Sequence, residues 1–577
     1  MEDKRTALAI VLSMVVVLMY SQTFMPQPTA PAPAVTGSTL NSADGQGEQS
    51  ALNTPAGIAP SAANGTAGTG APIAAKNAVT REQIDAAGSI VVTTDLLSAN
   101  VTLLGGRLRS LTLHRYANKL GSEARVELVE EEVTAPYPLA LSSATDNDSA
   151  VLYRVAGAEG IEGSESTASR YQLRTTEGSL TLVGNHPIWG TVTKKVVIRQ
   201  DGYLIGVQAT LAQPATTPIG LEWNQAIPTD PAKAKEDPWQ IALLDQDGDI
   251  ERKSIEKVST SFESKGLLKW AALGDRYFQA ALIASEGTSS FGIGRSGNSL
   301  SMKAVGGNRG GEFRLYAGPK DHETLIATGF DLRRTIDLGV FTFLADPLLQ
   351  LLRFFHWILG NYGLAIILLI LTIKIAFYPL TAAGFKSMQK MQELQPEMEK
   401  LRAKYKDATE LNQAVMELYK KKGVNPLGGC FPMLIQVPVF LGLYNALLQS
   451  IELRHQPFAL WVTDLSSPEK LILFGVPIPL MIIVMGISMI WQQWTTPTTG
   501  DPSQKKIGMV MTLVFVLMFI VFPMPAGLVL YWLINNIMSI TQQIYLRNAH
   551  GTHPFVATML TSVVLFFAGY IAVLTTT

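Results

Sequence analysis

One lysine lies in the middle of an apolar run. Lys374 stands in the stretch LTIKIAFYPLT, from Leu371 to Thr381, whose other residues are mostly apolar. An ammonium group at the centre of a membrane-spanning helix costs roughly 2.5 to 3.5 kcal/mol, so it needs either compensation or a role. One explanation is that the flexible side chain lifts its charge toward the nearer headgroups. The other is that the charge belongs to a polar site inside the membrane.

A second group of residues falls on one face of a later apolar segment. These residues follow one another at helical intervals: Trp532, Asn536, Ser539 and Gln543. Because these polar residues share one side of a helix, that side must contact protein or water and not lipid. Gln436 adds another amide within a separate apolar segment. Hydrogen bonds between helices explain any single amide of this kind, but together with Lys374 the set favours a shared hydrophilic cavity.

Three methionines recur every four residues in a further apolar segment: Met481, Met485 and Met489. Methionine adapts its shape to irregular apolar partners, so these residues fit a surface along which a variable apolar segment slides. Ordinary packing against lipid is the competing explanation for the same pattern.

The elements that must position these residues are apolar helices in the second half of the chain. We expect an interfacial helix at 346–359, where polar residues recur along one side of an apolar segment. Membrane-spanning helices are expected at 362–380, 434–449, 471–491, 507–522 and 528–546. Residues 385–424 carry nine Lys or Arg against six Asp or Glu and read as a helical hairpin. The excess of positive charge predicts that this hairpin is cytoplasmic. Residues 551–577 include a possible extra transmembrane segment, Pro554 to Leu574.

The start of the chain predicts an anchor and a tether. Residues 1–25 place Lys4 and Arg5 ahead of an apolar run, which indicates a transmembrane anchor with a cytoplasmic N-terminus. A cleaved signal peptide is the alternative, with Ala32-Pro33-Ala34 as its small-residue site. Residues 26–79 are rich in Ala, Pro and Gly, so we expect a disordered periplasmic linker.

Between these parts, residues 80–335 favour strands. Apolar and polar residues alternate, and Asp201-Gly202 between two such runs is a strong hairpin signal. The expected fold is a large antiparallel β sandwich outside the cytoplasm. Two motifs in it are poor matches. Gly292 to Gly297 fits G-x-G-x-x-G but no helix-forming stretch follows, and the aspartates from Asp245 to Asp249 lack the glycine spacing of a calcium loop.

Composition excludes several functional classes. The chain has 577 residues, of which 47% are hydrophobic, and its net charge of −1 gives no sign of nucleic-acid recognition. Its single cysteine, Cys430, excludes an intramolecular disulfide and a cysteine-based zinc site. No phosphate-binding loop is present in the sequence. We therefore expect no enzyme activity, no cofactor and no metal.

Longer motifs resemble a known family. The stretches NYGLAIILLILTIKIAFYPLT, VNPLGGCFPMLIQVPVFLGLY, LRHQPFALWVTDLS and FPMPAGLVLYWLINN look like the bacterial YidC family of membrane protein insertases. The order of anchor, low-complexity linker, β domain and basic hairpin is similar as well. The resemblance covers nearly the whole chain, to about Asn548, and the segment after it departs from the family.

The resemblance implies an N-terminal anchor and a five-helix core around a hydrophilic groove that is open to the cytoplasm and to lipid. Lys374 matches an arginine of that groove, keeping the charge but losing the bidentate fork. Gln436 and Asn536 match polar positions, Tyr531 matches an aromatic, and Trp532 replaces a tyrosine. The β domain resembles the family's supersandwich. The client-binding residues would then be Lys374, Gln436, Tyr531, Trp532, Asn536, Ser539 and Gln543, and the client-sliding surface would be Met481, Met485 and Met489.

The function implied is that of a membrane protein insertase and folding chaperone in the bacterial inner membrane, acting with or without the Sec translocon. Nascent membrane proteins, the Sec translocon, lipids and, through the hairpin, the ribosome and targeting factors are the expected partners. The alternative is a small-solute transporter or channel, which predicts inverted repeats that the sequence lacks. A third class is a membrane-tethered protein whose β domain binds sugar or peptide.

Overall fold

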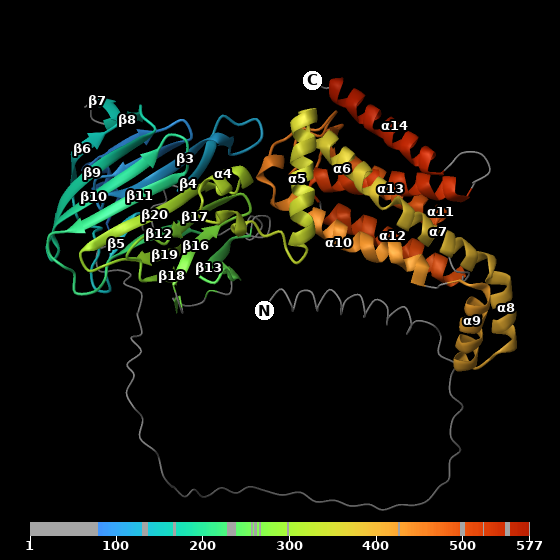
Figure 1. The fold of residues 1–577 in the computed structure, drawn as a ribbon. Coiled ribbons are helices and arrows are strands. Elements are labelled where there is room, and N and C mark those ends of the chain that lie inside the picture. The colour runs from blue at the N-terminus through green and yellow to red at the C-terminus, as the bar shows by residue number, and fades with distance from the viewer. Residues whose placement is uncertain are drawn as a thin grey trace, which may run out of the picture.

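The computed structural model separates into a β-rich part and a helical part (Figure 1). It describes residues 79–129, 137–164, 169–227, 238–255, 258, 262–264, 267–296, 299–424, 427–496, 502–522, 524–547 and 554–575. The expected anchor at 1–25 and nearly all of the expected linker at 26–79 lie outside these residues. The short helix α2 (Arg81–Ala87) opens the described part, capped by Thr80, and leads into the first strand.

The strands of the β domain form three sheets. The six-stranded sheet has the order β4-β3-β2-β1-β8-β7, with β1 (Ser89–Thr93), β2 (Leu97–Thr102), β3 (Arg107–Ala117), β4 (Arg125–Val129), β7 (Ile161–Ser164) and β8 (Ser169–Leu173). The nine-stranded sheet has the order β14-β13-β16-β17-β20-β11-β10-β9-β6, with β6 (Tyr153–Glu159), β9 (Glu177–His186), β10 (Gly190–Arg199), β11 (Leu204–Leu211), β13 (Gln240–Asp245), β14 (Ile250–Ser254), β16 (Leu268–Gly274), β17 (Phe278–Ile283) and β20 (Gly310–Pro319). The five-stranded sheet has the order β15-β18-β19-β12-β5, with β5 (Ala140–Ser142), β12 (Gly220–Ala226), β15 (Phe262–Glu263), β18 (Ser290–Ser296) and β19 (Ser299–Val305).

Pairing within the sheets is almost entirely antiparallel, as expected. The exception among the described strands is β1, which runs parallel to β8. The predicted hairpin around Asp201-Gly202 joins β10 to β11, with Ile198 opposite Ile205. Strands β10 and β11 alternate buried and exposed residues, whereas β17 is buried along its whole length. A strand buried on both faces belongs to a covered layer, so β17 lies inside the domain.

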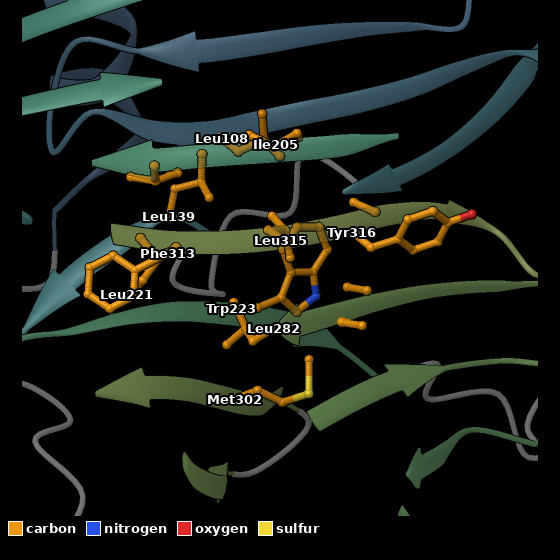
Figure 2. Packing of buried hydrophobic residues seen from close by; sticks show 14 of the residues in the cluster. Leu108, Leu139, Ile205, Leu221, Trp223, Leu282, Met302, Phe313, Leu315 and Tyr316 are labelled. Carbon is orange, nitrogen blue, oxygen red and sulfur yellow. The ribbon is translucent and has the colours of Figure 1, made fainter. Parts of the chain in front are cut away.

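The core of the β domain takes in residues of all three sheets, and one part of it lies where the nine-stranded and five-stranded sheets face each other. Figure 2 shows side chains from β12, β17, β19 and β20 meeting there, among them Trp223, Leu282, Met302 and Leu315. Trp223 is 1% exposed and Leu315 is fully buried, so the two sheets exclude water between them.

The two weak motifs of the β domain are structural. Gly292 and Gly294 lie within β18, which pairs with β19 instead of leading into a helix. The aspartates at Asp245 to Asp249 form the turn between β13 and β14, where the Asp249 N–H donates to Asp245 Oδ1 at 2.7 Å. No cluster of potential metal ligands occurs among the described residues.

The helical part follows the β domain through two short helices, α4 (His322–Ala327) and η2 (Leu332–Thr335). Its longer elements are α5 (Thr342–Leu359), α6 (Tyr362–Ala376), α7 (Tyr378–Glu393), α8 (Gln395–Lys404), α9 (Ala408–Lys422), α10 (Leu427–Gln449), α11 (Leu480–Thr495), α12 (Pro502–Val521), α13 (Ala526–Arg547) and α14 (Pro554–Leu574). Helix α5 lies between the β domain and the other helices, while α8 and α9 lie at the far end (Figure 1).

Several boundaries have local causes. Helix α5 ends at Gly360, which has a left-handed φ of 67°, and Asn361 then caps α6 by accepting from the Leu364 N–H at 3.1 Å. Helix α6 stops before Tyr378-Pro379 because proline at the start of the next helix cannot donate to the preceding turn. Met391, Leu394, Met398, Tyr419 and Val424 form a small core that holds α7, α8 and α9 together.

The expected helix at 471–491 requires a correction. Residues at its start form a β-hairpin from β21 (Leu471–Leu473) and β22 (Val476–Ile478), and α11 begins only at Leu480. Gly475 supplies a left-handed turn residue, and Pro477 and Pro479 disfavour a helix there. Within the described residues no single helix has the length and hydropathy of a membrane span, whereas α6 and α7, bent by 62°, reach them as a pair.

The loop after α10 links the two parts of the molecule. The short helix η3 (Ile451–Leu453) places Ile451, 4% exposed, in the core of the β domain. Arg454 donates to the carbonyl oxygens of Ala117 at 2.7 Å and Asn118 at 2.9 Å, at the end of β3. Arg353 of α5 donates to Glu452 at 3.1 Å, and both side chains are largely buried. We call this set of contacts the joint.

Candidate functional site

Lys374 lies inside the helical core. It is the third residue before Phe377, where α6 ends, and it is 8% exposed. Its Nζ donates to Ser539 Oγ of α13 at 2.8 Å. Among the described residues no carboxylate lies within ion-pair distance of Lys374. A buried ammonium with one hydroxyl partner keeps donor capacity to spare, because lysine has three N–H donors.

The predicted polar face of α13 exists, but its members have different partners. Asn536, 2% exposed, donates to Ser488 Oγ of α11 at 3.0 Å. Gln543 accepts from Thr495 Oγ1 at 2.8 Å, near the end of α11. The face therefore joins α6 through Ser539 and α11 through the two amides.

The remaining predicted client-binding residues form an aromatic and amide group near the start of α13. Gln436 of α10 donates to the Tyr531 hydroxyl at 2.9 Å. Trp532 packs edge to face against Phe440 and Phe519, with ring centroids 4.8 Å and 5.4 Å away. Trp532 thus contributes aromatic packing between α10 and α12, and the polar contact at this level is made by Gln436 and Tyr531.

The methionines of α11 point into the helical core. Met481 and Met485 are 6% and 2% exposed and belong to the same apolar cluster as α6 and α13, while Met489 is half-buried at its edge. In this conformation a client reaches them only if α11 separates from its neighbours, so the sliding surface remains a prediction.

Sequence reasoning missed one buried amide. Gln542 is 2% exposed, and neither its side-chain oxygen nor its nitrogen has a hydrogen-bond partner among the described residues. It lies three residues after Ser539, the partner of Lys374, on the adjoining part of the same helix face. Its spacing of three residues from Ser539 was the available signal, because residues three and four apart share a helix face.

The fold and the site together define a class of protein. A β-rich domain is joined to an apolar helical core whose interior holds a cation and several amides, and buried polar groups of this kind mark functional sites in membrane helices. The family models agree with both parts. Residues 89–351 match the YidC periplasmic domain, and residues 354–553 match the 60Kd inner membrane protein.

Curated relatives match over most of the chain. The chain is 36% identical over 568 residues to the membrane protein insertase YidC of Pelobacter propionicus, covering 94% of this chain and 99% of that protein. It is 38% identical over 478 residues to the membrane protein insertase YidC of Geobacter sulfurreducens, covering 80% and 86%. A solved structure of an active YidC insertase aligns with 80% of this chain and 92% of its own, at 20% identity and a TM-score of 0.34. The chain belongs to the YidC family of membrane protein insertases.

Proposed function

We propose that this chain inserts transmembrane segments of nascent proteins into the bacterial inner membrane and assists their folding. The observation that carries the proposal is Lys374, a buried cation with a hydroxyl partner and no acidic one among the described residues. Such a charge attracts acidic groups of an incoming client. The amides at Gln436, Asn536 and Gln543 supply replaceable hydrogen bonds along the same path.

The energy of insertion comes from the client. A segment of about 20 apolar residues gains roughly 6 to 12 kcal/mol on entering lipid, at about 0.3 to 0.6 kcal/mol per residue. The barrier is the client's short polar flank, which must cross hydrocarbon first. Polar partners part-way through the bilayer shorten that crossing, and no nucleotide hydrolysis is then required.

Access to the groove requires movement of α11. In the described conformation Asn536 is paired with Ser488, and Met481 and Met485 are buried. We infer that α11 separates from α13 when a client enters, which opens the amides first and then the methionines. The client helix would leave along the methionines into lipid.

The proposed topology places the N-terminus and the α8–α9 hairpin in the cytoplasm and the β domain in the periplasm. The positive charge excess of residues 385–424 supports the cytoplasmic side of the hairpin. In Figure 1 the hairpin and the β domain lie at opposite ends of the helical part, as this topology requires. Helices α6, α10, α11, α12 and α13 would cross the membrane, and α14, which packs against α6 and α13, would be a further crossing.

The expected partners follow from this topology. The hairpin would approach the ribosome or targeting factors, and the β domain would contact the Sec translocon. Both are proposals about surfaces on opposite sides of the membrane.

Site-specific photocrosslinking to a stalled nascent membrane protein tests the groove. Photoreactive residues at Asn536 and Gln436 should crosslink to the client, and the same residue at Val564 should not. Val564 is a suitable control because it lies on α14 and is 65% exposed, away from the polar pairs. Crosslinks from Val564 alone would contradict a path through the helical core.

A further inference from the structure

The β21–β22 hairpin presents an unusual apolar surface. Every residue from Ile472 to Pro477 is exposed and none is charged. Phe474 at the tip is 98% exposed, and Ile472 is 71% exposed. Contiguous exposed apolar surface on a folded protein marks a site of interaction with a partner or a membrane.

Turn chemistry does not explain the phenylalanine. Phe474 and Gly475 are the two central residues of the turn, with φ of 54° and 80°. Two positive φ angles define the type I′ hairpin turn, for which asparagine or aspartate followed by glycine is preferred. A bulky residue in the left-handed region is uncommon and costs about 1 to 3 kcal/mol. The turn geometry therefore disfavours phenylalanine at the tip and does not account for its presence there.

The base of the hairpin is fixed while its tip is free. Glu469 is 6% exposed; one carboxylate oxygen accepts from the Met481 N–H at 2.6 Å and the other accepts from the Trp461 indole N–H at 2.9 Å. These contacts tie the hairpin to the first turn of α11. Strands of three residues make a hairpin that is marginal in water by itself, so an environment that covers the apolar tip would stabilise it.

The hairpin directly precedes α11, which also carries exposed apolar residues. Ile483, Val484 and Ile487 of this helix are 38%, 41% and 61% exposed. Helix α11 has 16 residues, which corresponds to about 24 Å, and this is shorter than the roughly 30 Å hydrocarbon core. The apolar hairpin lies at the start of the helix and extends its lipid-compatible surface.

We propose that the β21–β22 hairpin inserts into the bilayer interface on the side of the β domain and acts as a lipid anchor for α11. Phe474 enters the boundary between headgroups and acyl chains, and the exposed Lys470 reaches the headgroups. The outer strand edges keep unpaired backbone groups, which restricts the hairpin to the hydrated interface. The inference rests on the proposed membrane topology and adds a contact with lipid that this topology does not require.

The test uses the full chain in lipid vesicles with Cys430→Ser, which removes the single cysteine. Phe474→Cys is labelled with an environment-sensitive fluorophore, and quenching by lipids that carry a nitroxide near the headgroup is measured. We expect blue-shifted emission and strong quenching. Val514→Cys on α12, 51% exposed, should be quenched by deep nitroxides, and Leu152→Cys on the β domain, 62% exposed, should stay unquenched.

The controls separate the two proposals. Quenching at position 514 without quenching at 474 would overturn the anchor and leave the membrane topology intact, whereas loss of both would remove the topology itself. The measurement at position 474 is repeated with fewer protein molecules per vesicle. If the blue shift then disappears, a second copy of the chain covers the hairpin, and the lipid anchor is overturned. Phe474→Asp should abolish the lipid contact, and Phe474→Leu should retain it.

Discussion

At the scale of single residues, the charge of Lys374 has a testable role. Lys374→Ala should lower insertion of a client with an acidic N-terminal tail by about tenfold to a hundredfold, because a hydrogen bond to a charged group contributes about 1.5 to 3 kcal/mol. Lys374→Arg should retain most activity, since the charge remains. The assay is reconstituted insertion, with a client whose tail is neutral as control. Undiminished insertion of the acidic client by the alanine variant would remove the charge from the mechanism.

A second buried lysine has a structural role in the β domain. Lys194 Nζ donates to Asp148 at 2.7 Å and to the carbonyl oxygens of Gly105 and Leu139 at 3.0 Å and 2.9 Å. Lys194→Met should destabilise the protein by about 3 to 5 kcal/mol, because Asp148 would remain buried without its counter-charge. Thermal unfolding of the full chain measures this. The double variant with Asp148→Asn should lose less than the sum of the two single losses, and simple additivity would refute the coupling.

The same scale shows the limits of sequence reasoning. The helical spacing predicted that Ser539 and Asn536 share a face, and both side chains are directed into the core from α13. Which residue pairs with Lys374 depends on the rotation of α6 against α13, and the packing of two helices determines that rotation. Pairing between distant helices could therefore not be read from spacing alone.

At the scale of elements, a histidine makes the α4–α5 contact sensitive to pH. Burial, together with Arg353 and Arg333, lowers the pKa of His322 from 6.5 to about 4, although Asp346 and Asp321 oppose the shift. The folded state thus disfavours the protonated ring, whereas the unfolded chain binds a proton below about pH 6.5. Stability should fall as the pH drops from about 6.5 to 4. In His322→Gln the unfolding midpoint should no longer change with pH over this range. If it changes with pH as steeply as in the parent chain, His322 is not the titrating group.

One glycine holds a loop against the start of α6. A Cβ at Gly363 would lie 2.0 Å from Cδ2 of Phe458, so the ring and its loop would have to move. Gly363→Ala should destabilise by about 1 to 3 kcal/mol through overpacking. Gly442→Ala in α10 is the matched control, because its Cβ would meet its nearest atom at 3.5 Å, an ordinary contact. Equal unfolding midpoints for the two variants would show that the loop carrying Phe458 moves to accommodate the added Cβ without loss of stability.

Elements differed in how well the sequence predicted them. Long apolar segments and the turn at Asp201-Gly202 were clear because periodicity and turn chemistry agree there. The hairpin at Leu471 to Ile478 was missed because its continuous apolar run reads equally well as the start of a helix. Its prolines and Gly475 were the available signal.

At the scale of the whole molecule, insertion should depend on the helical part. All of the predicted client-binding residues lie between Lys374 and Gln543, and none comes from the β domain. Deletion of residues 95–314 should therefore leave most insertion activity, although it uncovers Ile451 and removes the acceptors of Arg454. The measurement is insertion by the deleted chain in vesicles. Complete loss of insertion, with the helical core still folded, would favour a binding role for the β domain.

The division of the molecule into two parts could be predicted, but the joint between them could not. The switch from alternating to continuous hydrophobicity after about Phe341 separates the two compositions. Contacts across the boundary come from Ile451 and Arg454, and the acceptor of Arg454 at Ala117 lies 337 residues earlier in the chain. No local sequence pattern marks such a pair.

Because of this joint, the two parts of the molecule are held together at a second place, far along the chain from the segment that connects them covalently. The connection from η2 to α5 is the covalent link, but the loop after α10 returns to the β domain and is held there by Arg454 and Ile451. A single protease nick between residues 336 and 341 would therefore not release the β domain. The two fragments would stay associated and migrate as one particle until denaturant disrupted the buried contacts.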